Sequence, residues 1–325
     1  MVRFTVLASG SKGNSTVVSG GRTRILIDAG LSCRETFRRM KLAGEDPETL
    51  DAIVITHEHQ DHVNGLAATA RKLGIPAYMT EATHRAWMRW LTPRRQMTYA
   101  QWLEQCRKQS AERQAETDLE AVDGEADEPE NTGQIPETVA RSSDEGSEKT
   151  TSVKADPTWL PSVEYFTAGS PFCIGDIDLS PFTIPHDAAD PVGFVLRAEG
   201  VRMGFATDLG YIPPNVKAQL KGVDLLLLES NHDLEMLRDG PYPWSVKQRV
   251  LSRVGHLSNE AAAAFLSSGY DGQAAYVILA HLSESNNLPE LARVAANLAL
   301  SERASLLANK LLIASQNDPL ESIAF

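Results

Sequence analysis

AIVITHEHQDH, residues 52–62, joins a short apolar run rich in β-branched residues to three histidines and the carboxylate of Asp61 within six residues. The apolar run predicts a buried strand, and the polar residues after it predict a loop from which side chains can fan out. Imidazole and carboxylate groups are ligands for zinc and other divalent first-row metals. His57, His59, Asp61 and His62 are therefore candidate metal ligands, in a spacing that differs from the helical HExxH pattern.

Upstream of this segment, strand-like runs alternate with helical patterns. The runs cover residues 4–8, 15–19 and 23–30, and each ends where polar residues begin. Apolar residues at helical spacing predict helices at 33–42 and 63–73. This first third of the chain therefore has the pattern of an α/β protein.

The composition changes over residues 107–156, where aromatic and β-branched residues are few. Residues 111–156 hold 14 acidic and 4 basic side chains, whereas the rest of the chain holds 29 acidic and 27 basic ones. Such a segment buries too little apolar area to offset its ordering entropy. We predict one domain formed by 1–106 and 157–325, interrupted by a disordered acidic insertion at 107–156. A segment that binds a protein partner is the alternative.

Strand-like segments resume after the insertion and are followed by helical patterns. The predicted strands cover 177–185, 192–200, 201–208, 223–230 and 275–280. A helix is predicted at 258–267 with Ser258 as its cap, and another from about Pro289. Because both halves of the chain run from strands to helices, we predict an α/β sandwich of two sheets with helices outside.

Composition and charge exclude several classes of protein. The 325 residues are 42% hydrophobic, which suffices for a large core. Cys33, Cys106 and Cys173 lack CxxC spacing, which argues against a disulfide framework and a cysteine zinc site. No apolar run of about 18 residues occurs, and we expect a soluble, cytoplasmic protein with no membrane partner. The net charge of −12 resides mostly in the acidic segment, so a nucleic-acid partner stays open.

These motifs resemble the metallo-β-lactamase superfamily, whose signature is HxHxDH followed by an isolated His, Asp and His. The isolated residues here are His186 in IPHDAADPVGF, Asp208 in FATDLG and His281 in ILAHLSESNN. The resemblance implies a four-layer αβ/βα sandwich that binds two divalent metals. It assigns His57, His59 and His186 to one metal, Asp61, His62 and His281 to the other, and Asp208 to a bridging position. Asp28, at the end of a strand, matches a residue that braces the histidine loop.

Several phrases narrow the resemblance to the YycJ/WalJ/VicX branch of this superfamily, among them LASGSKGNST, ILIDAGLSC, LLLESNHDLEML and GHLSN. That branch implies a metal-dependent hydrolase associated with DNA exonuclease activity, and its wider neighbours include phosphodiesterases such as tRNase Z. Two metals about 3.5–4 Å apart can activate a hydroxide and neutralise charge on a phosphate ester. We therefore predict a dinuclear phosphodiesterase, and more specifically a DNA exonuclease that acts from 5′ ends.

Two further residues are candidates for the chemistry. His256 precedes an Ala-rich helix and resembles a histidine that clamps phosphate or protonates the leaving group, although a histidine there can also simply pack. Asp61 can orient or deprotonate the nucleophile in addition to binding metal. We expect His232, after the LLLL run, to bond to groups that orient the ligands.

Substrate contacts are less sharply indicated. The loop SGSKGNS can cradle phosphate with its backbone N–H groups or form an ordinary turn between strands. Its candidate contacts are Ser9, Ser11, Asn14 and Ser15. Lys247, Arg249 and Arg253, near Trp244, form either a solvated helix face or a surface that tracks a nucleic-acid backbone.

The sequence leaves the metal and the substrate open. His and Asp ligands accept zinc, manganese or iron. A ribonuclease or a hydrolase of small cyclic phosphodiesters is the alternative within enzymes. A non-catalytic interaction protein, in which the metal only stabilises the fold, is the alternative of another class, although the complete ligand set argues against it.

Overall fold

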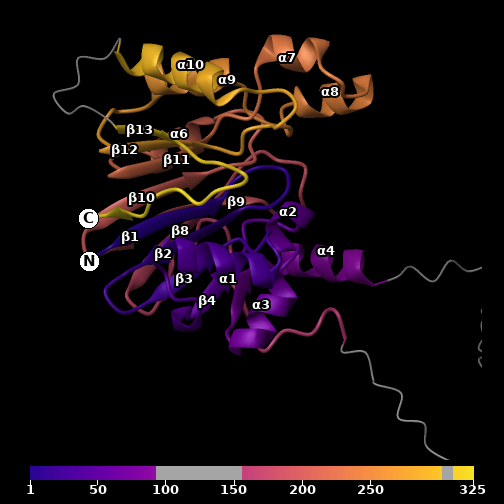
Figure 1. Cartoon of the computed structure of the whole chain (residues 1–325), viewed down its shortest axis with the longest axis vertical. Helices are drawn as coiled ribbons and strands as arrows, with labels where there is room; N and C mark the ends of the chain where they lie inside the picture. Colours follow the sequence, from indigo (N-terminus) through magenta and orange to yellow (C-terminus); the bar gives the residue numbers. More distant parts are fainter. Residues whose placement is uncertain (93–155, 302–309) are drawn as a thin grey trace, which may run out of the picture. The chain divides into compact units, whose positions relative to one another are not determined.

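The structure, a computed structural model, describes residues 1–92, 156–301 and 310–325 (Figure 1). The predicted insertion at 107–156 therefore lies outside the described residues, apart from Asp156. Cys106 also lies outside them.

Two seven-stranded sheets form the centre of the fold. The first has the order β14-β1-β2-β3-β4-β5-β6 and the second β13-β12-β11-β10-β9-β8-β7. The strands of the first sheet are β1 (Arg3–Ala8), β2 (Ser15–Ser19), β3 (Arg24–Ile27), β4 (Ala52–Val54), β5 (Ala77–Met79), β6 (Val163–Tyr165) and β14 (Ile323–Ala324). Those of the second are β7 (Phe172–Ile174), β8 (Ile177–Thr183), β9 (Val192–Ala198), β10 (Val201–Ala206), β11 (Leu225–Glu229), β12 (Tyr276–Ala280) and β13 (Lys310–Ile313).

Helices cover the outer face of each sheet, as Figure 1 shows for α1 and α3 on one side and α9 and α10 on the other. The helices before residue 93 are α1 (Cys33–Leu42), α2 (Gln60–Val63), α3 (Leu66–Leu73) and α4 (Glu81–Leu91), with a 3-10 turn η1 (Pro47–Thr49). Those after residue 155 are α6 (Pro214–Gln219), α7 (Leu234–Asp239), α8 (Trp244–Val250), α9 (Asn259–Ala264), the π turn η2 (Phe265–Gly269) and α10 (Pro289–Ser301). No helix in these described ranges is long and apolar enough to cross a membrane.

Three buried clusters hold the layers together. The central one joins the inner faces of both sheets, with Phe4 and Ile25 from the first and Phe194 from the second. The other two fill the space between each sheet and its helices, and include Leu66 on one side and Leu266 on the other. Buried apolar area is the main favourable term in folding. The predicted four-layer α/β sandwich is confirmed.

Strand direction brings chemistry-bearing residues to one edge of each sheet. β3 and β4 are parallel, as are β10, β11 and β12. β8 runs in the same direction as β10, because β9 is antiparallel to both. Ligand sites in parallel sheets lie beyond the carboxyl ends of the strands. These strand ends therefore supply the polar residues that follow them in the sequence.

Three residues at these strand ends adopt a left-handed backbone. Asp28, Asp208 and His281 have φ of 59°, 61° and 57°. A non-glycine residue in this region is uncommon, and such strain clusters at functional sites. Each of the three lies within two residues of the end of its strand, at β3, β10 and β12. The chain thus turns sharply where these side chains enter the site.

Gly30 marks a close contact between the loop after β3 and the histidine loop. A Cβ on Gly30 would lie 1.6 Å from the backbone oxygen of Asp61 and 2.6 Å from the backbone nitrogen of Asn14. We expect Gly30→Ala to displace the histidine loop, to cost about 3 kcal/mol of unfolding free energy and to weaken metal binding. Urea unfolding and metal titration measure both effects.

Gly74→Ala is the matched control for this substitution. Gly74 ends α3 with φ of +67° and would have nothing within 4 Å of an added Cβ. We expect it to cost about 1 kcal/mol through backbone strain and to leave metal binding unchanged. Equal metal affinity in Gly30→Ala and Gly74→Ala would show that the loop contact does not position the ligands.

Candidate metal centre

The seven predicted metal ligands lie together at the edge where these strands end. Four overlapping groups of side chains place ligand atoms within 4.8 Å of one another. Three of the groups contain only predicted ligands: His57, His59 and His186; Asp61, His62 and His281; and His57, His62 and Asp208. The ligands come from both sheets, so the folded sandwich is needed to assemble them.

The first group consists of three imidazoles whose ring nitrogens face one another. His186 Nε2 lies 3.2 Å from His59 Nδ1, and the ring of His57 is 4.6 Å from that of His59. His186 Nδ1 lies 3.1 Å from the carbonyl oxygen of Gly255. If Nδ1 donates to that carbonyl, Nε2 keeps its lone pair for a metal.

The second group combines a carboxylate with two imidazoles. Asp61 Oδ2 lies 3.3 Å from His281 Nε2 and 3.5 Å from His62 Nε2. His62 Nδ1 lies 2.8 Å from Asp28 Oδ2, and the hydroxyl of Thr56 also donates to Asp28. The completely buried Asp28 thus orients the His62 ring, as the sequence resemblance implies.

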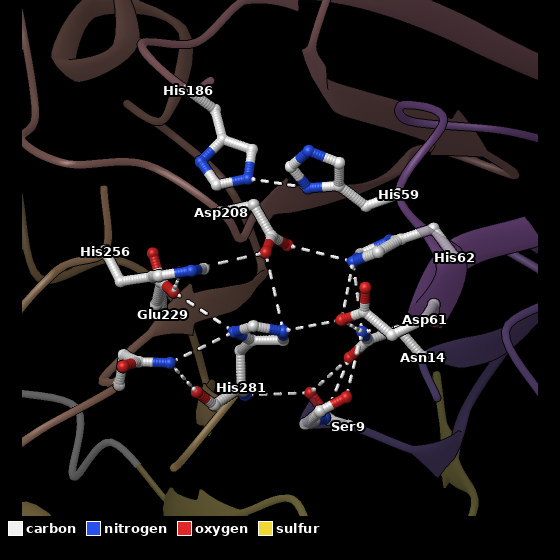
Figure 2. A network of polar contacts seen from close by, with 12 residues as sticks. Ser9, Asn14, His59, Asp61, His62, His186, Asp208, Glu229, His256 and His281 are labelled. Atoms are coloured by element: carbon white, nitrogen blue, oxygen red, sulfur yellow. Dashed lines mark hydrogen bonds and ion pairs between the residues drawn. The ribbon is translucent and has the colours of Figure 1, made fainter. Parts of the chain in front are cut away.

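Asp208 lies between the two groups (Figure 2). Its Oδ2 is 3.4 Å from His62 Nε2 and its Oδ1 is 3.4 Å from His281 Nε2. Burial would raise the pKa of Asp208, but the neighbouring His281 and His62 lower it well below its usual range. A carboxylate in this position can contact a cation in either group.

The chemistry of the donors fits divalent cations. Among the described residues, His57 Nε2 and Asp208 Oδ2 are buried side-chain atoms without a hydrogen-bond partner. A buried polar atom left unpaired costs about 1–3 kcal/mol, and more when it is charged. Cations bound by these atoms would remove that cost. Divalent metal use agrees with this donor set of imidazoles and carboxylates.

Glu229, the last residue of β11, belongs to the site although the sequence analysis missed it. Its Oε1 lies 2.7 Å from His256 Nδ1 and 3.2 Å from His281 Nδ1. Its Oε2 accepts hydrogen bonds from the backbone N–H groups of Leu209 and Leu257. Both oxygens are therefore occupied, and Glu229 orients two histidine rings instead of offering a free ligand atom. The signal was a charged residue that ends a run of four leucines.

His256 lies at the edge of the site and is partly exposed. Its ring stacks on that of His281 at 5.2 Å, and its Nδ1 is 3.8 Å from Asp208 Oδ1. His256 Nε2 has no hydrogen-bond partner among the described residues, and the residue lines the pocket above the ligands. The position agrees with the predicted contact to substrate.

The predicted phosphate loop instead supports the ligands for the most part. Asn14 Nδ2 lies 3.1 Å from Asp61 Oδ2 and 3.0 Å from His62 Nε2. Ser9 Oγ accepts a hydrogen bond from the backbone N–H of His281. Ser15 is buried in β2 without a partner for its hydroxyl, and Ser11 is the one of the four that lines the pocket. Ser11 is thus the residue of this set placed to touch substrate.

His232 does not join this network. It is 1% exposed, and neither ring nitrogen has a hydrogen-bond partner among the described residues. The predicted bonding of His232 to ligand-orienting groups is therefore not seen. Its backbone forms a bridge to Ser258 at the start of α9. Burial lowers the pKa of His232 to about 4, so the ring is neutral near pH 7.

Metal affinity at this site is expected to depend on pH. Burial opposes a charge on His62 and His281, but the surrounding carboxylates raise the pKa of both well above its ordinary value. Coordination needs the neutral ring, so bound protons compete with metal. As pH falls from about 8 to about 6, we expect affinity to drop about tenfold per pH unit for each proton displaced. Calorimetric titration in buffers of different ionisation enthalpy measures the protons released. A pH-independent affinity with no proton release would contradict this interpretation.

Comparisons with known proteins show which proteins this chain resembles. A family model described as the metallo-beta-lactamase superfamily matches residues 8–242. The chain is 32% identical over 302 residues to exodeoxyribonuclease YycJ of Bacillus anthracis, covering 93% of this chain and 90% of that protein. It is 31% identical over 292 residues to exodeoxyribonuclease WalJ of Streptococcus pneumoniae, covering 90% and 86%. The crystal structure of the metallo-beta-lactamase fold protein YhfI from Bacillus subtilis superposes with a TM-score of 0.59 at 13% identity, covering 98% of both chains, which shows a shared fold.

Proposed function

The chain belongs to the metallo-beta-lactamase superfamily and is a metal-dependent hydrolase, and on this premise we propose that it degrades DNA as an exonuclease from 5′ ends. The observation that carries the DNA assignment is the 32% identity, over 93% of the chain, to a relative named as an exodeoxyribonuclease. The 5′ polarity rests on the resemblance of the sequence motifs. The complete set of predicted ligands at one edge supports hydrolysis of a phosphate ester.

The proposed roles follow from the positions of the side chains. His57, His59 and His186 would hold one cation, Asp61, His62 and His281 the other, and Asp208 would contact both. Two divalent cations held there would lower the pKa of a water and neutralise charge on phosphate. Zinc or manganese suits these ligands, and iron is also compatible. Asp28 and Asn14 fix the orientation of His62 and Asp61.

His256 would act on the leaving group. Glu229 accepts from its Nδ1, so the ring is held in one orientation at the rim of the pocket. When the ring is doubly protonated, Nε2 can donate a proton to the oxygen that leaves phosphorus. Asp61 lies at the floor of the same pocket, where it can orient the attacking water.

A time course on end-labelled polymers tests the proposal. Linear duplex DNA and RNA, labelled at either end, are incubated with protein loaded separately with Mn²⁺ or Zn²⁺. An Asp61→Ala, Asp208→Ala double variant accompanies the wild type. Asp318→Ala is the matched control, because Asp318 is an exposed carboxylate that does not line the pocket. We expect progressive loss of a 5′ DNA label in wild type and control, and none in the double variant.

Other outcomes discriminate the alternatives. Cleavage of RNA with intact DNA would replace the proposal by a ribonuclease. Hydrolysis of a small cyclic phosphodiester alone would indicate a small-molecule phosphodiesterase. Full activity of the double variant would overturn the assignment of the site.

A further inference from the structure

Arg249 on α8 is the one lysine or arginine among the described residues that line the pocket above the candidate ligands. The pocket has a volume of about 380 Å³. One wall is formed by α8, which presents Val246, Arg249 and Val250 at helical spacing, and by Tyr242 just before it. The sequence analysis left this cation open between a solvated helix face and a nucleic-acid contact.

Arg249 is aimed by a residue next to a metal ligand. Its Nε donates to the carboxylate of Asp187, which directly follows His186. The backbone N–H of Asp187 in turn donates to the carbonyl oxygen of Val254 at 3.0 Å. The bond from Arg249 to the Asp187 carboxylate uses one of the five N–H donors of the guanidinium. The side chain of Arg249 is 59% exposed, so its remaining donors are available to a ligand.

The two lysines nearby, Lys12 and Lys247, do not line the pocket. Lys247 Nζ donates to the carbonyl oxygen of Arg238 at 2.7 Å, and the lysine is buried. Lys12, beside the pocket residue Ser11, forms an ion pair with Glu284 at 2.6 Å. The carboxylates of Asp61 and Asp208 would hold the cations. Arg249 is thus the group best placed to meet a negative charge of the substrate that the metals do not reach.

We propose that Arg249 binds the phosphate next to the one that is cleaved, so that the site selects a polynucleotide over an isolated phosphodiester. This inference rests on the proposed function. A nucleic-acid strand carries a phosphate at every linkage, and a guanidinium matches two phosphate oxygens with parallel N–H groups. Phosphate contacts of this kind set the register of a strand without reading its sequence. Arg249 is then a substrate-binding residue, and Asp187 positions it.

The test compares two substrates and one neutral linkage. Kinetics are measured on a short DNA strand and on bis(4-nitrophenyl) phosphate, which has no neighbouring phosphate. In further strands, the linkage on either side of the scissile one is replaced in turn by an uncharged methylphosphonate. We expect Arg249→Ala to lower kcat/KM on DNA by about 10- to 100-fold and to leave the small ester unchanged within about twofold.

The methylphosphonate linkage and the Arg249→Ala substitution together form a double-mutant cycle, because each removes one partner of the proposed contact. At one of the two positions it should slow the wild type about as much as Arg249→Ala does, and slow the variant by less than about threefold. Arg238→Ala is the control, because Arg238 is an exposed arginine on α7 that pairs with Asp239 and does not line the pocket. It should behave as wild type on every substrate.

The outcomes separate this inference from the proposed function. Equal losses on DNA and on the small ester would overturn it, because Arg249 would then act on the metal site through Asp187. The inference would also be overturned if both methylphosphonates slowed the Arg249→Ala variant as much as they slow the wild type. A wild type that cleaves the small ester and no DNA would overturn the DNA function itself.

Discussion

Asp208→Asn is expected to reduce turnover about 1000-fold or more and to lower the metal content of the purified protein. Asp208 approaches His62 and His281 at 3.4 Å, and its Oδ2 is buried without a hydrogen-bond partner. An asparagine keeps the shape but replaces one oxygen by an NH₂ group, which cannot bind a cation. The loss of about 4 kcal/mol of charge stabilisation corresponds to about three decades in rate.

Metal analysis and single-turnover kinetics on the same preparations check this result. Asp239→Asn is the control, because Asp239 is exposed on α7 and pairs with Arg238. Retention of the full metal content together with more than about a tenth of the activity would contradict a shared role for Asp208. The unfolding transition of the metal-free proteins shows whether the substitution also affects the fold.

The strands and the four candidate ligands within residues 57–62 were readable from the residues themselves, whereas His186, Asp208 and His281 were assigned only through the family resemblance. Each ligand follows an apolar strand, and strands that run in the same direction deliver their ends to the same edge. His57 and His281 are far apart in the chain, yet His57 lies three residues beyond the end of β4 and His281 directly follows β12. The β-branched and leucine runs predicted the strands because each is buried on both faces.

The residues that orient the ligands were harder to read. Glu229 ends a buried strand, and a buried carboxylate needs partners, but nothing in the sequence says that these are His256 and His281. Asn14 was a candidate substrate contact because it belongs to a loop whose backbone N–H groups can cradle phosphate. Its role depends on the position of Asp61, which a different strand supplies.

The bounds of helix α8 were not predicted, although a solvated helix face was one interpretation of Lys247 and Arg249, because the segment lacks a buried apolar stripe. Most of its residues are exposed, and Lys247 is the one buried residue within its bounds. Periodicity detects helices that pack on a core and misses those that line a site. The pocket wall that carries Arg249 could therefore not be placed from the sequence.

Glu229→Gln is expected to lower kcat about 100-fold or more and to cost about 3 kcal/mol of unfolding free energy. Burial opposes its charge, but His256 and His281 lower the pKa of Glu229 to about 2, so it is ionised at neutral pH. The Glu229 carboxylate accepts from two backbone N–H groups and faces the Nδ1 atoms of two histidines, and all four need an acceptor. The NH₂ group of a glutamine would face either the two backbone N–H groups or the two histidine rings. In the second orientation, Nδ1 of both rings must accept a hydrogen bond. His281 then carries its proton on Nε2, the nitrogen it needs for metal, and His256 cannot hold the second proton that its proposed role requires.

The substitution His256→Ala separates the effect of Glu229 on His256 from its effect on His281. We expect it to lower kcat by about 100- to 10,000-fold with unchanged metal content. Adding Glu229→Gln to His256→Ala should then lower kcat by a smaller factor than Glu229→Gln does alone, because the contribution of Glu229 through His256 is already lost. Glu290→Gln, an exposed change on α10, controls for the substitution itself. Strictly additive losses would mean that Glu229 acts through His281 and the metal alone, and that the contact with His256 at 2.7 Å only packs the ring.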